Sequence, residues 1–123
     1  MVKRILAVDD SPIVLSAIAI VLESIDYVVQ TAKDGVDALD VLKREKEKFN
    51  AIITDVNMPN MDGVTLTAEI RKLPGYGFTP IIILTTESQT SKKEEGKKAG
   101  ATGWLVKPVK PDMLLATMKK ICS

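Results

Sequence analysis

Residues 5–10, Ile5-Leu6-Ala7-Val8-Asp9-Asp10, join a short run of apolar side chains to a pair of carboxylates. Four later runs repeat this design of aliphatic and β-branched residues bounded by turn residues. They are Tyr27-Val28-Val29, Ala51-Ile52-Ile53, Ile81-Ile82-Ile83-Leu84 and Trp104-Leu105-Val106. The runs predict five strands, each apolar throughout, as in a sheet that is buried on both faces.

Segments with helical periodicity separate these runs. Apolar side chains recur at i, i+3 and i+4 in four of them, at residues 12–24, 35–46, 63–72 and 111–121. Residues 90–98 have the length of a helix but almost no apolar face, so we expect this fourth of five helices to be the most loosely anchored element. Alternation of strands and helices predicts an α/β fold with a doubly wound, five-stranded parallel sheet.

Length and composition bound the class of protein. The chain has 123 residues, 46% of them hydrophobic, and a net charge of +1, which predicts a single domain over residues 1–123 without an output domain. It has neither a bilayer-spanning run nor a secretory signal pattern, so we expect a cytoplasmic protein without membrane attachment. Aromatic residues make up 4% of the chain, too few to predict a nucleic-acid platform. The absence of histidine excludes a Ser-His-Asp triad and a histidine zinc site.

Polar residues occupy the ends of the predicted strands. Asp9 and Asp10, Asp55, Thr85 and Lys107 follow four of the runs, and a parallel sheet brings such ends to one edge. Two carboxylates about 4 Å apart repel by roughly 4 kcal/mol at an effective dielectric of about 20, a cost that a bound cation offsets. Oxygen ligands alone favour Mg²⁺. The pattern predicts a magnesium and phosphoryl site with Asp55 as the nucleophile, the acidic pair on the metal, and Lys107 and Thr85 on the phosphoryl oxygens.

Four motifs together carry a resemblance over the whole chain. They are Asp9-Asp10-Ser11, Asp55-Val56-Asn57-Met58-Pro59 with Asp62-Gly63, Leu84-Thr85-Thr86-Glu87, and Gly103-Trp104-Leu105-Val106-Lys107-Pro108. The set resembles the receiver domain of two-component response regulators, of the stand-alone chemotaxis type with a flavodoxin-like fold. The resemblance implies strand order 2-1-3-4-5 and phosphorylation of Asp55. It also implies Mg²⁺ bound by Asp10, Asp55 and the backbone carbonyl of Asn57, with Asp9 acting through water.

The resemblance also implies a conformational switch. Lys107 contacts the phosphoryl group, and its bond to Pro108 is a candidate cis peptide. Thr85 moves toward the phosphoryl group, which leaves space for Trp104 to rotate inward and reshape the surface of the fourth helix, fifth strand and fifth helix. Trp104 departs from the tyrosine or phenylalanine that is usual there. Asn57 and Glu87 occupy positions that tune hydrolysis of the aspartyl phosphate.

The expected role is therefore a signalling switch whose only chemistry is its own phosphorylation and dephosphorylation. A histidine kinase supplies the phosphoryl group, and a monomer then binds a downstream protein, such as a flagellar motor switch, in chemotaxis. Alternatives are a phosphorelay intermediate or phosphate sink, and a phosphohydrolase of the haloacid dehalogenase type. The latter prefers two aspartates separated by one residue and a larger chain. A flavodoxin-like cofactor binder would need a Ser/Thr/Gly-rich phosphate loop where this chain is acidic.

Overall fold

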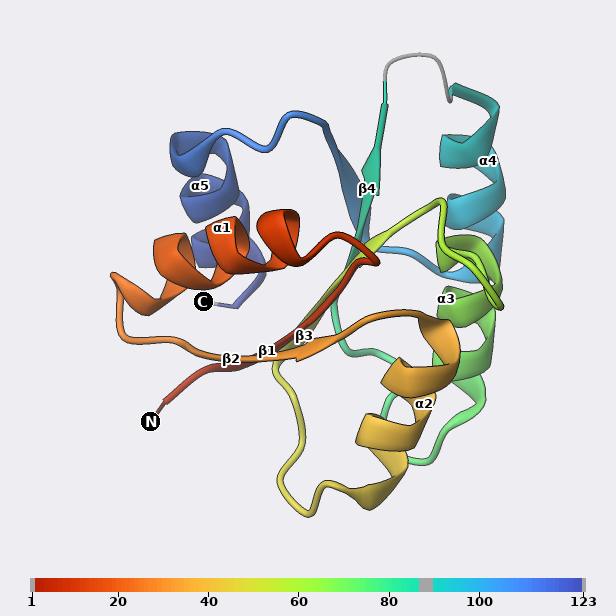
Figure 1. The fold of residues 1–123 in the computed structure, drawn as a ribbon. Coiled ribbons are helices and arrows are strands. Elements are labelled where there is room, and N and C mark those ends of the chain that lie inside the picture. Colours follow the sequence, from red (N-terminus) through yellow and green to blue (C-terminus); the bar gives the residue numbers. More distant parts are fainter. Residues whose placement is uncertain (1, 87–89, 123) are drawn as a thin grey trace.

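A computed structural model describes residues 2–86 and 90–122. Its strands are β1 (Arg4–Val8), β2 (Val28–Ala32), β3 (Ala51–Asp55), β4 (Ile81–Thr85) and β5 (Gly103–Val106). They form one sheet in the order β2-β1-β3-β4-β5, and every neighbouring pair is parallel (Figure 1). The predicted fold class and strand order are confirmed.

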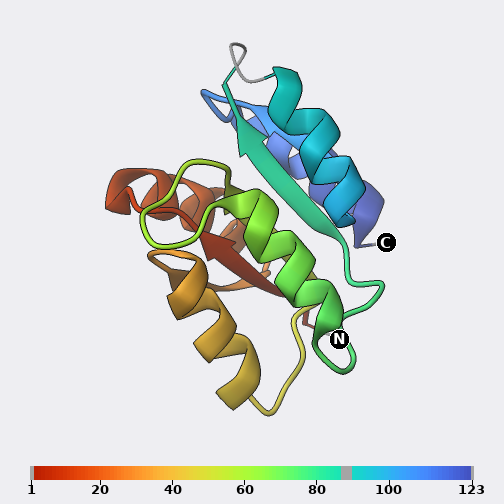
Figure 2. The same ribbon diagram turned by 90° about the vertical axis from the view of Figure 1, so that its right-hand side faces the viewer.

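Helices cover both faces of the sheet. They are α1 (Pro12–Glu23), α2 (Gly35–Arg44), α3 (Gly63–Lys72), α4 (Thr90–Ala99) and α5 (Pro111–Ile121). Helices α1 and α5 lie on one face, whereas α2, α3 and α4 lie on the other, with α3 beside α4 (Figures 1 and 2). The described residues contain no helix that is long and apolar enough to cross a membrane.

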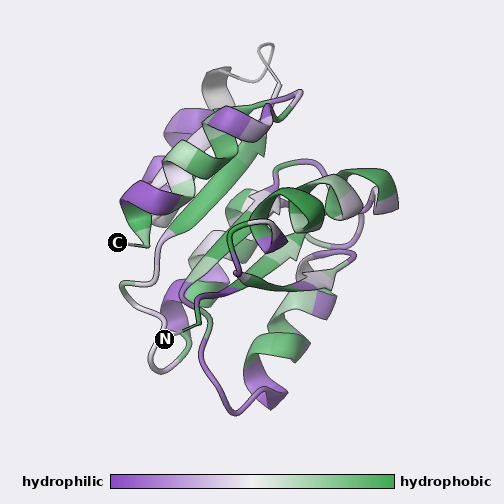
Figure 3. Cartoon of the chain, turned by 90° about the vertical axis from the view of Figure 1, so that its left-hand side faces the viewer, coloured by the Kyte–Doolittle hydropathy of each residue, from purple (hydrophilic) through white to green (hydrophobic). Residues whose placement is uncertain are grey.

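The core is divided between the two faces because strand side chains alternate. Ile5 and Ala7 of β1 pack with α1 and α5, while Leu6 and Val8 pack with α2 and α3. Hydrophobic residues run through the strands, and hydrophilic residues lie in the loops and in most helices, whereas α1 is hydrophobic along most of its length and exposes Ile13 and Ile20 (Figure 3). This double burial explains why the strands are apolar throughout rather than alternating.

Three helices begin at side-chain caps on the edge of the sheet where the strands end. Ser11 accepts a hydrogen bond from Val14 N (3.4 Å), Asp34 from Asp37 N (2.8 Å) and Asp62 from Thr65 N (2.7 Å). Such bonds satisfy amide donors that the helix itself leaves free. They also fix the turns that follow β1, β2 and β3.

Polar residues close the central strands. The ladder of β3 continues to Asp55 and that of β4 to Thr85, so these two residues lie at the strand ends, as predicted. Thr54 is buried within β3, and its hydroxyl is satisfied there because it donates a hydrogen bond to the Asp55 carbonyl (3.0 Å). Strand β2 begins one residue later than predicted and extends to Ala32, since an edge strand tolerates polar side chains.

Candidate functional site

Three carboxylates meet at the carboxyl edge of the sheet. Asp9 directly follows β1 and is 1% exposed, Asp55 ends the neighbouring β3 and is 7% exposed, and Asp10 points to solvent. One carboxylate oxygen from each residue lies within 4.8 Å of the others. The parallel register places them there, because Val8 pairs with Thr54 and the next residue of each strand carries the acid.

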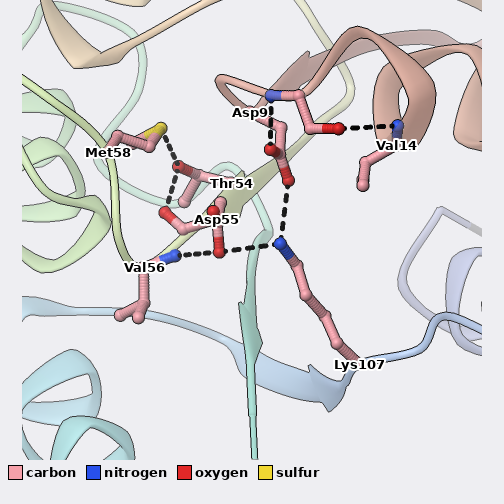
Figure 4. Close-up of polar contacts among 8 residues, drawn as sticks. Asp9, Val14, Thr54, Asp55, Val56, Met58 and Lys107 are labelled. Carbon is pink, nitrogen blue, oxygen red and sulfur yellow. Dashed lines mark hydrogen bonds and ion pairs between the residues drawn. The ribbon is translucent and has the colours of Figure 1, made fainter.

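Lys107 crosses from β5 to this cluster. Its Nζ lies 3.1 Å from Asp9 Oδ2 and 3.1 Å from Asp55 Oδ1, between the two carboxylates (Figure 4). Its backbone N–H donates to the Thr85 carbonyl (2.6 Å), and the Lys107–Pro108 peptide is cis, the isomer that the resemblance implied. The side chain and the backbone of Lys107 thus tie three strand ends together.

The charges of the cluster suit a divalent cation. Three carboxylates and one ammonium give −3 + 1 = −2. Within the described residues Asp10 has no ion pair, although it is the acid nearest to solvent. An open, all-oxygen set of this kind fits Mg²⁺, which keeps several of its waters. Residues at this edge therefore match the predicted magnesium site in chemistry.

Burial and charge shift the protonation of the central pair. Burial raises the pKa of Asp55, the charge of Asp9 raises it further, and Lys107 opposes both effects. Burial by itself would lower the pKa of Lys107, but the hydrogen bonds and charges of Asp55 and Asp9 outweigh it, so that pKa is raised. Lys107 therefore stays charged and favours the ionised form of Asp55.

Gly63 fixes the backbone next to Asp55. Val56 N donates to Asp55 Oδ1 (2.9 Å), and Gly63 N donates to the Val56 carbonyl (2.9 Å), which closes the loop between β3 and α3. A Cβ on Gly63 would lie 2.2 Å from the Asp55 carbonyl oxygen, so only glycine fits this approach. Asn57 lies in the same loop with an exposed side chain.

The predicted switch residues occupy the neighbouring strands. Thr85 is fully buried, and its hydroxyl has no hydrogen-bond partner within the part of the chain that is described. Trp104, on edge strand β5, is 42% exposed. Glu87, the second predicted hydrolysis residue, lies outside the described residues.

Two contacts of α4 were missed by the sequence reasoning. Lys93 of α4 lies over Trp104, with Nζ 5.6 Å from the ring centroid. Arg71 of α3 donates to the carbonyls of Gly100, Tyr76 and Thr79 and so ties the end of α4 to the loop before β4. A lysine or an arginine in a surface helix gives no sequence signal for a contact with a residue so far along the chain.

The sequence matches a known family model and known proteins. The family model for the response regulator receiver domain matches residues 5–119. The chain is 43% identical over 115 residues to the sensor histidine kinase RcsC of Salmonella typhimurium, covering 93% of this chain but 12% of RcsC. It therefore spans a small part of that relative.

Solved structures show the same fold. The Vibrio cholerae chemotaxis response regulator CheY4 is 45% identical, with a TM-score of 0.90 over 98% of this chain and 99% of that one. The receiver domain of the sensor histidine kinase PA1611 of Pseudomonas aeruginosa is 31% identical, with a TM-score of 0.87 over 100% of both chains. That structure has a magnesium ion coordinated in its active site cleft. The chain belongs to the response regulator receiver domain family.

Proposed function

We propose that this chain is a phosphorylation-controlled switch that accepts a phosphoryl group on Asp55 from a phosphohistidine of a histidine kinase. The observation that carries the proposal is the buried Asp55 carboxylate, which lies beside two other acids and 3.1 Å from the Lys107 ammonium. In the transfer, an Asp55 oxygen forms a bond to phosphorus while the phosphorus–nitrogen bond breaks. The imidazole nitrogen keeps that electron pair.

The residues around Asp55 have separate roles in this proposal. Asp10, Asp55 and the backbone carbonyl of Asn57 would hold Mg²⁺, with Asp9 acting through water. Bound Mg²⁺ supplies positive charge for the phosphoryl oxygens and offsets the repulsion among the acids. Lys107, which lies between Asp9 and Asp55, is placed to exchange a carboxylate contact for a phosphoryl oxygen.

In this proposal, phosphorylation of Asp55 changes the shape of the protein surface around Trp104. A buried hydroxyl without a partner costs about 1–3 kcal/mol, so a hydrogen bond to a phosphoryl oxygen on Asp55 would stabilise a movement of the Thr85 hydroxyl toward that oxygen. Trp104 then turns into the space that Thr85 leaves. Trp104, Pro108 and Met113 line a hollow of about 490 Å³ beside β5, which changes shape with the tryptophan. Asn57 and Glu87 set how long the aspartyl phosphate survives.

The downstream partner in this proposal is a protein that binds the surface of α4, β5 and α5. Likeness to CheY4 favours a chemotaxis pathway, with a flagellar motor switch or another downstream protein as the partner. We place the chain in the cytoplasm with its kinase, as a monomeric single domain. A phosphorelay intermediate or phosphate sink is the second candidate, because the chain also resembles part of a sensor histidine kinase.

Intact-mass spectrometry tests the chemistry. Wild-type protein and Asp55→Asn are incubated with acetyl phosphate and Mg²⁺, with a chelator as the metal control. We expect the wild type to gain one phosphoryl group only when Mg²⁺ is present, and Asp55→Asn to gain none. Equal uptake by the two proteins would place the phosphoryl group elsewhere and refute the assignment.

A further inference from the structure

Lys93 and Trp104 form the cation–π contact that links α4 to β5. Lys93 Nζ lies 5.6 Å from the centre of the indole ring, and Trp104 is 42% exposed in this arrangement. A cation over the face of tryptophan within about 6 Å is attracted by the ring quadrupole. Lys93 belongs to α4 and Trp104 to β5, so a rotation of the indole ring about its own side-chain bonds would move it away from the ammonium and break the contact.

The sheet register shows what inward rotation would change. Trp104 pairs with Ile83, and Thr85 pairs with Val106. Side chains two residues apart on a strand share a face, so Ile83 and Thr85 point to the same side of β4. That side faces α4, because a Cβ on Gly96 would lie 2.7 Å from Ile83 Cδ1. Trp104 therefore lies on the α4 face of the sheet, beside the space above Thr85.

Helix α4 packs beside α3 and touches β4, but the described part of its sequence, residues 93–99, has few apolar side chains to hold it over β5. Of its described side-chain positions, 93–99, the buried one is Gly96, which has no side chain to pack. Its carboxyl end is anchored instead by Arg71, whose guanidinium donates to the Gly100 carbonyl at 2.8 and 3.0 Å. A polar helix of this kind takes its position from a few contacts, and Lys93–Trp104 is one of them.

We propose that Lys93 is a positioning residue for the switch, which holds Trp104 outward in the unphosphorylated protein and so opposes activation. The inference rests on the proposed function, in which Trp104 turns inward when Asp55 is phosphorylated. Inward rotation removes the ring from the ammonium, so the contact stabilises the inactive state alone. An exposed cation–π contact changes such an equilibrium by about two- to five-fold.

The test uses Lys93→Met, which keeps an unbranched chain and helix propensity but removes the charge. Lys93→Arg retains a cation for the ring. Lys97→Met is the matched control, because Lys97 is exposed on the next turn and has no ring contact within the described residues. Two quantities are measured: the apparent affinity for beryllofluoride with Mg²⁺, and quenching of Trp104, the single tryptophan, by neutral acrylamide.

We expect Lys93→Met to bind beryllofluoride about two- to five-fold more tightly than wild type, because less free energy is needed to reach the active state. It should also show less acrylamide quenching before the mimic is added. Lys93→Arg and Lys97→Met should match wild type in both measurements.

Three results would overturn the inference, and they separate it from the function on which it rests. If fluorine NMR shows that wild type binds beryllofluoride while Trp104 emission stays unchanged, both the tryptophan switch and the role of Lys93 fail. If wild type responds but Lys93→Met has the same affinity, the role of Lys93 alone fails. An equal shift in Lys97→Met would assign the effect to helix charge and refute the contact.

Discussion

Replacing Gly63 by alanine should displace the backbone of Asp55. The added Cβ would lie 2.2 Å from the Asp55 carbonyl oxygen and 3.0 Å from its carbonyl carbon, both backbone atoms that no rotamer change can move. Overpacking of a tight site costs about 1–3 kcal/mol. Gly63 opens α3, where alanine regains a few tenths of a kcal/mol in helix propensity at most. We expect a net loss of about 2 kcal/mol in the free energy of unfolding.

Two other glycines calibrate this expectation. A Cβ on Gly77 would meet no atom within 4 Å, so Gly77→Ala should remain within about 0.5 kcal/mol of wild type or be slightly more stable. A Cβ on Gly35 would lie 2.8 Å from Met61 Cβ and Cγ, and a rotation about χ1 moves Cγ but not Cβ. Gly35→Ala should therefore cost more than Gly77→Ala, but less than Gly63→Ala, where the contact is 2.2 Å and is made with the backbone. The order of the three stability losses follows from the atoms that each added methyl group would contact.

Urea unfolding followed by circular dichroism measures the stabilities, and intact mass after acetyl phosphate treatment measures the reaction of Asp55. Gly63→Ala should lose stability and also be phosphorylated more slowly while it is still folded, because the Asp55 backbone has moved. The reasoning is refuted if Gly63→Ala is as stable as Gly77→Ala and reacts at the wild-type rate.

Three further predictions concern the acids and the anchor of α4. Without metal, Asp10→Asn should raise the free energy of unfolding by less than about 1 kcal/mol, because Asp10 is exposed, and so raise the melting temperature; it should also weaken stabilisation by Mg²⁺. A lower melting temperature without metal would contradict the repulsion. Asp34→Ala should cost about 1 kcal/mol at pH 7, because its carboxylate accepts from Asp37 N and from the Asn60 amide. Those bonds lower the pKa of Asp34, so the stability they add is present above the unfolded pKa of about 3.9 and is lost as pH falls through the lower folded value. The difference in melting temperature from wild type should therefore shrink in acid, and a constant difference would refute the cap as its source. Arg71→Lys should cost about 2 kcal/mol and raise hydrogen exchange in α4 before the rest of the chain, since lysine cannot reach three carbonyls at once; unchanged exchange in α4 would count against the anchor.

Much of the fold could be predicted because its signals are local. Apolar runs located all five strands, and apolar periodicity located four of the five helices; α3 and α5 begin and end as predicted. Ser11 caps α1, whereas Lys110 gives α5 no side-chain cap. The predicted boundary was wrong at β2, where Gln30 and Thr31 continue the strand, because a hydrogen-bond ladder needs backbone groups rather than apolar side chains.

The candidate site was predictable for a topological reason. Once the sheet is parallel, residues that follow its strands must share an edge, and Asp9, Asp55 and Lys107 do so. Contacts between helix surfaces have no such rule. The position of Lys93 over Trp104 depends on how α4 lies against the sheet, which no local pattern in a polar helix specifies. Looseness of α4 stays a prediction for hydrogen exchange to test.

Trp104 emission during phosphorylation tests the central claim most directly, since the chain contains one tryptophan. Wild type and Asp55→Asn are treated with acetyl phosphate and Mg²⁺, and emission is followed while intact mass records the extent of phosphorylation. The account predicts that emission changes in proportion to the phosphorylated fraction of wild type and stays constant in Asp55→Asn. Full phosphorylation of wild type with unchanged emission and unchanged acrylamide quenching would contradict it.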